Sequence, residues 1–402
     1  MSLAKTIFTK PLKFGALALA AMLASGCSIF GDDELTYKEL QPIDATVTAS
    51  VVWEASVGKG VGEYYSRLNP AVAGDVIVAA DRRGVVQAFN RVSGASLWRV
   101  DVREMIGADT GGWMMPGDSA RIAGGLVAND ERVFFGTENG SVMALSMADG
   151  SLVWRTEIDG EVLADPAVGE GYLVVNTTAG KLVGLLEESG EQQWTMDTEV
   201  PPLSLRGTSA PTISSGGALF GTATGKLTVA VLNNGQQAWV APLAVPQGAT
   251  ELQRLVDADV QPQVQGNAVY SIAYNGQVAA VELSSGRILW QREYASFNNF
   301  DLSITRLFLT DTADTIYALD SNNGVEIWSN SDLTGRQVTG PVRFGNYVVV
   351  GDAFGYLHFL NASTGVMAGR LEVGNSVYVS PVVAGDTLYV QLRDGSLLAV
   401  RI

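Results

Sequence analysis

Two short segments of the chain carry side chains suited to binding another protein. In the first, Leu203 and Leu205 are spaced to share one side of an extended segment, and Arg206 follows them. In the second, Asp257 and Asp259 show the same spacing of two. Apolar residues beside an arginine and paired acids are typical of a protein-binding patch. The same residues equally allow an Arg–Asp ion pair that joins the segments within the molecule, so both interpretations stay open.

Side chains for catalysis or metal binding are scarce. The chain contains one Cys and one His, so it can form neither an intramolecular disulfide nor a mixed His/Cys metal site. His358 lies in the strand-like run Tyr356–Leu360, where a packed structural role is favoured over a catalytic one. No segment shows the alternating acids and closing Glu of a calcium-binding loop. We therefore expect no catalytic residues, no metal and no cofactor.

The repeated pattern that positions these segments begins past residue 40. Eight copies of one unit follow, each with two short strands of alternating apolar residues around a tight turn. A last strand then begins with Gly and carries Trp four residues later, and a seventh copy has Gly369 in place of Trp. The complete pairs are Gly94/Trp98, Gly150/Trp154, Gly190/Trp194, Gly235/Trp239, Gly286/Trp290 and Gly324/Trp328.

The ends of the repeat indicate how the fold closes. The eighth unit reaches Ile402 before its last strand, and the missing strand is expected at Val51–Trp53. Four strands per unit and a strand donated by the N-terminus predict an all-β, eight-bladed β-propeller over residues 44–402. Closure removes the exposed sheet edges of an open array. One Trp on each outer strand is expected to pack between neighbouring blades.

The longest connections join the last strand of one blade to the first strand of the next. In a uniform scaffold, function concentrates in such loops. All of these loops emerge on the same face of the disc. Residues 195–210 and 240–261 belong to successive crossings, so the two candidate segments are expected to be spatial neighbours.

Composition excludes one class of partner. The chain has 26 Lys+Arg against 42 Asp+Glu and a net charge of −16. An acidic surface repels phosphate groups, so a nucleic-acid partner is not expected. Apolar residues make up 47% of the chain, which is enough for the large core that eight blades require.

The N-terminus indicates export. Lysines precede the apolar stretch Phe14–Ala24, which is too short to span a bilayer. Its end, Ala24-Ser25-Gly26-Cys27, resembles the lipobox of bacterial lipoproteins, which implies a signal peptide over residues 1–26 and a lipid on Cys27. An ordinary signal peptide that contains a cysteine is the alternative. Residues 27–43 are expected to form a tether. Ser28 replaces the Asp that marks inner-membrane retention in Gram-negative lipoproteins, which implies the outer membrane.

Taken with the lipobox and the quinoprotein-type repeats, the segment Leu203–Pro211 resembles the BamB family, the propeller lipoproteins of the outer-membrane β-barrel assembly machine. The stretch Arg254–Asp259 matches that family as well. The resemblance implies a non-catalytic protein on the periplasmic face of the outer membrane that binds the POTRA domains of BamA. Other subunits and unfolded barrel precursors are further implied partners. Leu203, Leu205, Arg206, Asp257 and Asp259 are the binding residues it implies.

Two other functions compete with this one. The same repeat builds quinoprotein alcohol dehydrogenases, which hold pyrroloquinoline quinone and Ca²⁺ over the propeller axis; those enzymes are longer, and many use paired cysteines that this chain lacks. A propeller that binds glycan or peptidoglycan is the second alternative. It would use Trp113, Tyr64 and Tyr65 as stacking platforms.

Overall fold

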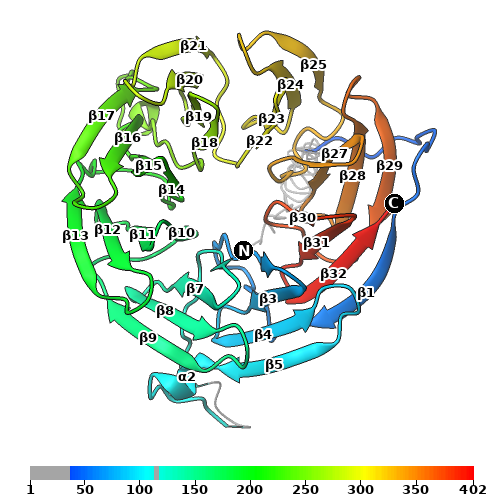
Figure 1. Cartoon of the computed structure of the whole chain (residues 1–402). Coiled ribbons are helices and arrows are strands. Elements are labelled where there is room, and N and C mark those ends of the chain that lie inside the picture. The colour runs from blue at the N-terminus through cyan, green and yellow to red at the C-terminus, as the bar shows by residue number, and fades with distance from the viewer. Residues whose placement is uncertain (1–36, 113–116) are drawn as a thin grey trace, which may run out of the picture.

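Figure 1 shows the computed structural model as a ring of eight four-stranded antiparallel sheets around a central axis. The structure describes residues 37–112 and 117–402. In blades 1 to 7, the four strands follow chain order from the axis to the rim. The predicted all-β, eight-bladed propeller is therefore confirmed. Trp113 lies outside the described residues.

The first four blades share this order of strands. They comprise β2 (Ala71–Ala73), β3 (Val76–Ala80), β4 (Val85–Asn90), β5 (Ser96–Asp101); β6 (Val127–Ala128), β7 (Arg132–Gly136), β8 (Ser141–Ser146), β9 (Leu152–Glu157); β10 (Ala167–Gly169), β11 (Tyr172–Asn176), β12 (Lys181–Leu186), β13 (Gln192–Asp197); and β14 (Thr212–Ser214), β15 (Gly217–Gly221), β16 (Lys226–Val231), β17 (Gln237–Pro242).

The last four blades repeat the arrangement. They comprise β18 (Gln263–Gln265), β19 (Ala268–Ile272), β20 (Val278–Glu282), β21 (Ile288–Arg292); β22 (Asp301–Leu302), β23 (Arg306–Thr310), β24 (Ile316–Asp320), β25 (Glu326–Asn330); β26 (Val342–Phe344), β27 (Tyr347–Gly351), β28 (Tyr356–Asn361), β29 (Met367–Glu372); and β30 (Val382–Ala384), β31 (Thr387–Gln391), β32 (Ser396–Arg401), β1 (Ser50–Ser56).

Among the residues that the structure describes, helical structure is confined to loops between blades. A short helix α2 (Val102–Met105) follows β5, and one 3₁₀ turn, η1 (Leu252–Arg254), lies between β17 and β18. Within the described residues, no helix has the length and apolar character needed to cross a membrane.

The last blade is closed by the N-terminal strand, as the sequence predicts. β1 pairs antiparallel with β32, with Ser56 opposite Ser396 and Ser50 opposite Arg401. The two ends of the propeller thereby share one sheet, and the backbone groups of β32 that face β1 gain hydrogen-bond partners.

Tryptophans of the outer strands join neighbouring blades. The Trp194 indole N–H of blade 3 donates to the Leu232 carbonyl of blade 4 at 2.7 Å. Its ring lies against Gly235, whose φ is +70° and where a Cβ atom would lie 2.5 Å from the ring. This glycine is thus required by both the turn and the packing. The predicted packing role is confirmed, and the other tryptophans with the same indole hydrogen bond are Trp53, Trp98, Trp154, Trp239, Trp290 and Trp328.

Blade 7 departs from this rule for a steric reason. In blade 1, Ala88 on the third strand faces Trp98 on the fourth. In blade 7 the sizes are exchanged, and Phe359 faces Gly369. The bare Gly369 leaves room for Val47, because a Cβ atom at 369 would lie 2.7 Å from a Val47 methyl group. The N-terminal segment therefore occupies the outer surface of this blade.

Candidate partner-binding site

The structure brings the two candidate segments together. The loop that carries Leu203–Arg206 joins β13 to β14, and the loop that carries Asp257 and Asp259 joins β17 to β18. The Leu205 backbone N–H donates to Asp257 Oδ1 at 3.1 Å. The contact across successive blade crossings agrees with the spacing of the repeat, and it ties the first loop to the second.

The five predicted residues lie at two depths. Leu203 is 44% exposed, the Arg206 side chain is 51% exposed, and Leu205 is half-buried. Asp257 and Asp259 are buried, with exposures of 1% and 4%. The first loop therefore presents the side chains that a partner can touch. The aspartates act from beneath it.

Arg206 pairs with acids that the sequence did not single out. Its guanidinium lies 3.5 Å from a carboxylate oxygen of Glu138 and 3.5 Å from one of Glu161. Glu138 also pairs with Arg82 at 2.7 Å. The alternative interpretation, in which Arg206 pairs with an aspartate of the second loop, is therefore wrong, because its partners are Glu138 and Glu161. The two loops are joined through the backbone of Leu205 instead.

Asp257 is held in an unusual electrostatic state. One carboxylate oxygen accepts the Leu205 N–H, and the other is buried without a hydrogen-bond partner in the described structure. Burial, and secondarily the neighbouring Asp259, raises the pKa of Asp257 to about 7. Burial also raises the pKa of Asp259, which the nearby Arg67 opposes. The base of the loop therefore exchanges a proton near neutral pH.

Stability is expected to depend on this proton. Folded Asp257 keeps its proton up to a pH of about 7, whereas the unfolded chain releases it near its ordinary pKa of 3.8. The unfolded state then binds fewer protons between these values, so the free energy of unfolding falls as pH rises through this range. We expect Asp257→Asn to lessen that fall. Urea unfolding of both proteins at pH 5 to 8 measures it, and parallel pH curves would contradict the expectation.

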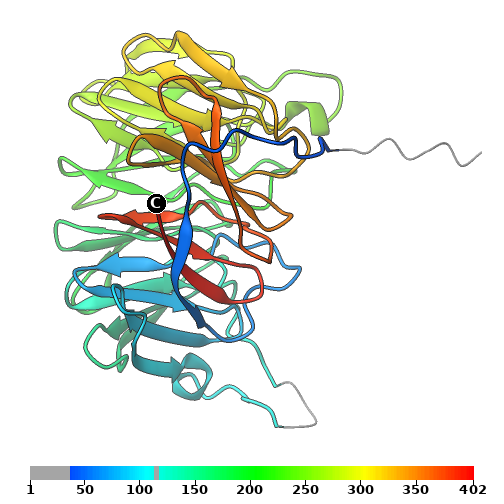
Figure 2. The same ribbon diagram turned by 90° about the vertical axis from the view of Figure 1, so that its right-hand side faces the viewer.

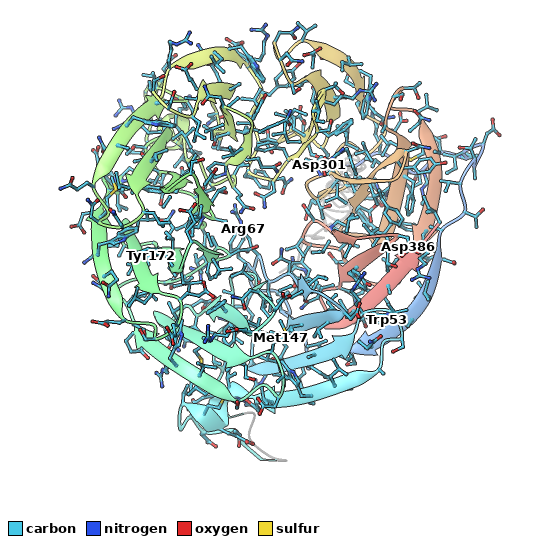
Figure 3. All side chains as sticks on the ribbon, in the orientation of Figure 1. Trp53, Arg67, Met147, Tyr172, Asp301 and Asp386 are labelled. Atoms are coloured by element: carbon cyan, nitrogen blue, oxygen red, sulfur yellow. The ribbon has the colours of Figure 1, made fainter. Side chains whose placement is uncertain are left out.

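Arg67 is a central residue that the sequence interpretation missed. Its guanidinium donates to the carbonyls of Thr208 at 3.2 Å, Asp259 at 2.8 Å and Phe297 at 3.3 Å, and its Nε donates to the Tyr65 hydroxyl at 2.9 Å. Figure 3 shows Arg67 near the axis of the ring. One side chain therefore links three successive blade crossings, including both candidate loops. The only sign of this role in the sequence is that Arg67 is a basic residue in the long connection between β1 and β2.

The segment around Arg67 occupies the axis at this face. Ser66 and Arg67 bond to the Ala123 carbonyl at 2.9 Å each, and the Tyr378 hydroxyl donates to the Leu68 carbonyl at 2.6 Å. These contacts reach the first and the seventh blade crossings. At this face the chain's own residues therefore lie across the axis of the ring.

A groove of about 740 Å³ lies beside Arg206. Tyr64, Tyr65, Arg82 and Glu138 line it. The two tyrosines proposed as glycan platforms are already engaged, because Arg82 lies over the Tyr64 ring at 3.9 Å and Arg67 bonds to Tyr65. The groove combines aromatic and charged side chains, as protein-binding surfaces do.

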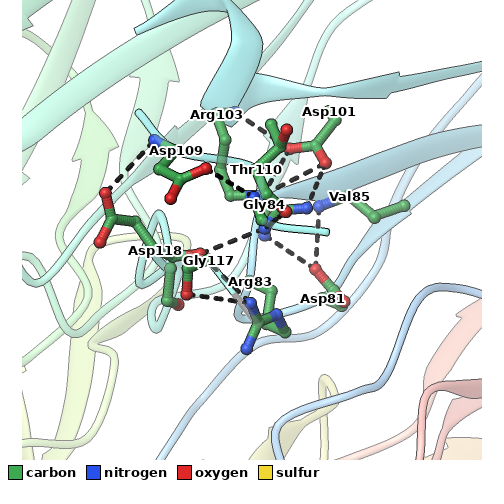
Figure 4. A network of polar contacts seen from close by, with 12 residues as sticks. Asp81, Arg83, Gly84, Val85, Asp101, Arg103, Asp109, Thr110, Gly117 and Asp118 are labelled. Atoms are coloured by element: carbon green, nitrogen blue, oxygen red, sulfur yellow. Dashed lines mark hydrogen bonds and ion pairs between the residues drawn. The ribbon is translucent and has the colours of Figure 1, made fainter. Parts of the chain in front are cut away.

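The described parts of the connection between β5 and β6, residues 102–112 and 117–126, border this groove and are held by arginine contacts. Arg103 pairs with Asp101 at 2.5 Å and donates to the carbonyls of Thr110 and Asp118, each at 3.2 Å. Figure 4 shows this network, in which Arg83 also reaches Asp118. The loop is therefore anchored at its base.

The described part of the chain contains no cluster of side chains suited to a metal centre. Among residues 37–112 and 117–402, no group of three or more His, Cys, Asp and Glu side chains could hold a metal ion. His358 is fully buried in β28 and bonds to Asp352 at 2.9 Å. The expected structural role of His358 is therefore confirmed.

The fold and the site together define a β-propeller with a surface suited to binding another protein. Comparison with known proteins narrows this class. A family model described as "Outer membrane protein assembly factor BamB" matches residues 82–330 and 330–402. The chain belongs to the BamB family of outer membrane protein assembly factors.

Relatives with this description match along nearly the whole chain. The protein of Yersinia pestis is 40% identical over 97% of this chain and 98% of its own. That of Escherichia coli K12 is 37% identical over 95% and 97%. The crystal structure of BamB from Moraxella catarrhalis superposes with a TM-score of 0.78 at 25% identity, covering 88% of this chain and all (100%) of that one.

The propeller itself is shared more widely. Quinohemoprotein alcohol dehydrogenase from Comamonas testosteroni superposes with a TM-score of 0.68 at 12% identity, over 88% of this chain and 76% of that chain. This likeness concerns the fold alone, because unrelated functions are built on one scaffold.

Proposed function

We propose that the chain is a non-catalytic scaffold of the outer-membrane β-barrel assembly machine. Residues 1–26 direct export, and a lipid on Cys27 holds the protein on the periplasmic face of the outer membrane. Its partners are the POTRA domains of the barrel-forming subunit BamA and, through them, the other subunits. The family membership supports this assignment.

The observation that carries the proposal is an exposed patch on a rigid support. Leu203 and Arg206 project from a loop whose backbone is fixed by Asp257 and Arg67. A loop that is already ordered loses little conformational entropy on binding. Leu203, Leu205 and Arg206 contact the POTRA domains, whereas Asp257 and Asp259 hold the loop in place from beneath.

The test is a pull-down from detergent-solubilised outer membranes with the full-length protein. Leu203→Asp combined with Arg206→Glu alters only exposed side chains. Loss of central interface residues of this kind costs about 2 kcal/mol or more, roughly a 30-fold weaker complex. We therefore expect the variant to lose the barrel-forming subunit that the wild type retains.

A matched variant on the opposite face controls for the change of charge and apolarity. Val366→Asp with Arg287→Glu makes the same types of substitution at positions with 63% and 66% exposure. It should retain the subunit, and thermal melts should show that all three proteins are folded. Retention by both variants would remove the patch from the proposal, and no retention by the wild type would remove the assembly function.

A further inference from the structure

The N-terminal segment does not leave the propeller where β1 begins. Residues 37–49 lie along blades 6 and 7 and are held by backbone and side-chain bonds. The Lys38 N–H donates to the Thr334 carbonyl at 2.9 Å, and the Thr46 N–H donates to the Ala368 carbonyl at 2.7 Å. Residues 37–43, which the sequence places in the tether, therefore already contact the propeller. We call residues 37–49 the clasp.

Three apolar side chains of the clasp are half-buried against the propeller. Leu40 and Ile43 pack against the core cluster between blades 6 and 7 that contains Leu333 and Met367. Val47 fills the space above Gly369. These contacts add apolar burial to the backbone bonds, and the clasp is thus a fixed part of the disc.

The outer end of the clasp reaches the face that carries the candidate site. The Tyr37 ring lies 4.6 Å from that of Phe354, in the turn between β27 and β28. This turn bonds to the blade-joining loop between β25 and β26, because the Ala353 N–H donates to the Arg336 carbonyl at 3.1 Å. Figure 2 shows the start of the clasp (dark blue), η1 (light green) and the insertion after β5 (cyan) projecting to the same side.

The length of chain beyond Tyr37 limits where that face can lie. Ten residue steps separate Tyr37 from Cys27, and a fully extended chain spans about 3.5 Å per residue. A lipid on Cys27 therefore holds Tyr37 within roughly 35 Å of the bilayer surface. From the clasp and this length, we infer that the face with the blade-joining loops is turned toward the membrane, so that partner domains are bound between the disc and the lipid. This inference rests on the lipid anchor of the proposed function.

The opposite orientation is opposed by geometry. A blade strand of six residues is about 20 Å long. If the opposite face were turned toward the membrane, the tether would have to run past the full thickness of the disc before it reached the bilayer. More than half of its length would be consumed. The disc would then lie directly against the headgroups, where its net negative charge is repelled by anionic lipid.

Energy transfer to a membrane tests the orientation. Cys27 is the only cysteine and carries the lipid, so an introduced cysteine is the single free thiol for a fluorescent donor. Val245→Cys places the donor on the loop face and Ile304→Cys places it in a turn on the opposite face; these positions are 67% and 80% exposed. The full lipidated protein is reconstituted in phosphatidylcholine vesicles with an acceptor on trace headgroups. Since the faces differ in height by about 20 Å, we expect roughly two-fold or greater transfer from position 245.

Release of the clasp provides the second arm. Tyr37→Ala combined with Val47→Asp removes the ring contact and the apolar filling above Gly369, and a thermal melt shows whether the propeller stays folded. The free tether then extends to residue 50, so the difference in transfer between the two donor positions should shrink toward equality. An unchanged difference would show that the clasp does not set the orientation.

Flotation of vesicles separates failure of this inference from failure of the anchor. The wild type should float with vesicles and Cys27→Ser should not. If neither floats, the lipid anchor and the orientation that rests on it are both wrong. If the wild type floats but transfer from position 304 equals or exceeds that from position 245, only the orientation is wrong. Binding to the barrel-forming subunit is tested independently by the pull-down.

Discussion

Replacing Arg67 with Met is expected to lower the free energy of unfolding by about 2–4 kcal/mol, because two part-buried carbonyls and an exposed one lose their donor at once. The carbonyls of Thr208, Asp259 and Phe297 all depend on this guanidinium. The buried Asp259 carboxyl loses its nearby cation as well. Chemical denaturation of the full chain measures the loss.

The same substitution should weaken partner binding even where the protein stays folded. Arg67 lies beneath the Leu203–Arg206 loop and links it to two other crossings, so its removal frees a loop that is otherwise ordered before binding. Arg67→Lys restores the charge but not the planar fork of donors, and we expect it to fall between Met and the wild type.

An exposed arginine provides the control for Arg67. Arg343 pairs with Asp301, and its side chain is 43% exposed. Surface ion pairs contribute about 0–1 kcal/mol, so Arg343→Met should change stability little and partner binding not at all. An equal decrease in the free energy of unfolding for Arg67→Met and Arg343→Met would show that the contacts of Arg67 at the axis contribute no more to stability than a surface ion pair.

The second large effect is expected at Asp352, which lies in blade 7, across the ring from Arg206 but on the same face. Its buried carboxylate accepts from Arg336 at 2.7 Å and from His358 at 2.9 Å, and from the backbone N–H groups of Phe354 and Tyr356. Asp352→Ala leaves the Arg336 guanidinium, 4% exposed, without a counter-charge. Breaking a buried pair in this way costs about 3–5 kcal/mol.

The protonation states of this cluster follow from burial and charge. Burial opposes ionisation of Asp352, but the bonds from His358 and Arg336 more than offset it and hold the pKa of Asp352 below its ordinary value. Burial lowers the pKa of His358, so the ring is neutral at pH 7. Its Nε2–H then donates to Asp352, and its Nδ1 accepts from Arg370 at 3.3 Å.

Two measurements distinguish the Asp352 cluster from an ordinary ion pair. Asp386 pairs with Arg401 at 3.5 Å and is 77% exposed, so Asp386→Ala should cost less than about 1 kcal/mol. Asp352→Ala should also loosen the clasp, because Arg336 donates to the Lys38 carbonyl and lies 4.4 Å from the centroid of the Phe354 ring. A melting temperature like that of Asp386→Ala would contradict the role assigned to the cluster.

The shared fold does not by itself separate this chain from the quinoprotein enzymes. In this chain Arg67 and Tyr378 fix the segment that fills the mouth of the axis. The repeat defines the scaffold, and a functional assignment has to rest on specific residues at the site.

Much of the architecture could be predicted because the same short sequence pattern recurs in each blade. Glycine four residues before tryptophan marks the outer strand of six blades, since the turn requires a positive φ and the ring requires a neighbour without a side chain. The missing last strand at Ile402 predicts its replacement by Val51–Trp53. Gly369 was visible as an exception, but its cause, Val47 lying above it, was not.

The sequence by itself determined the eight blades, their closure and the pairing of two loops on one face. Such features depend on periodicity and on distances along the chain. Only the tertiary structure decided depth and partners: it buried Asp257 and Asp259, paired Arg206 with Glu138 and Glu161, and brought in Arg67. A spacing of two shows which side chains share a side of a strand, but not whether solvent or another blade lies there. That is set by the packing of segments distant in sequence.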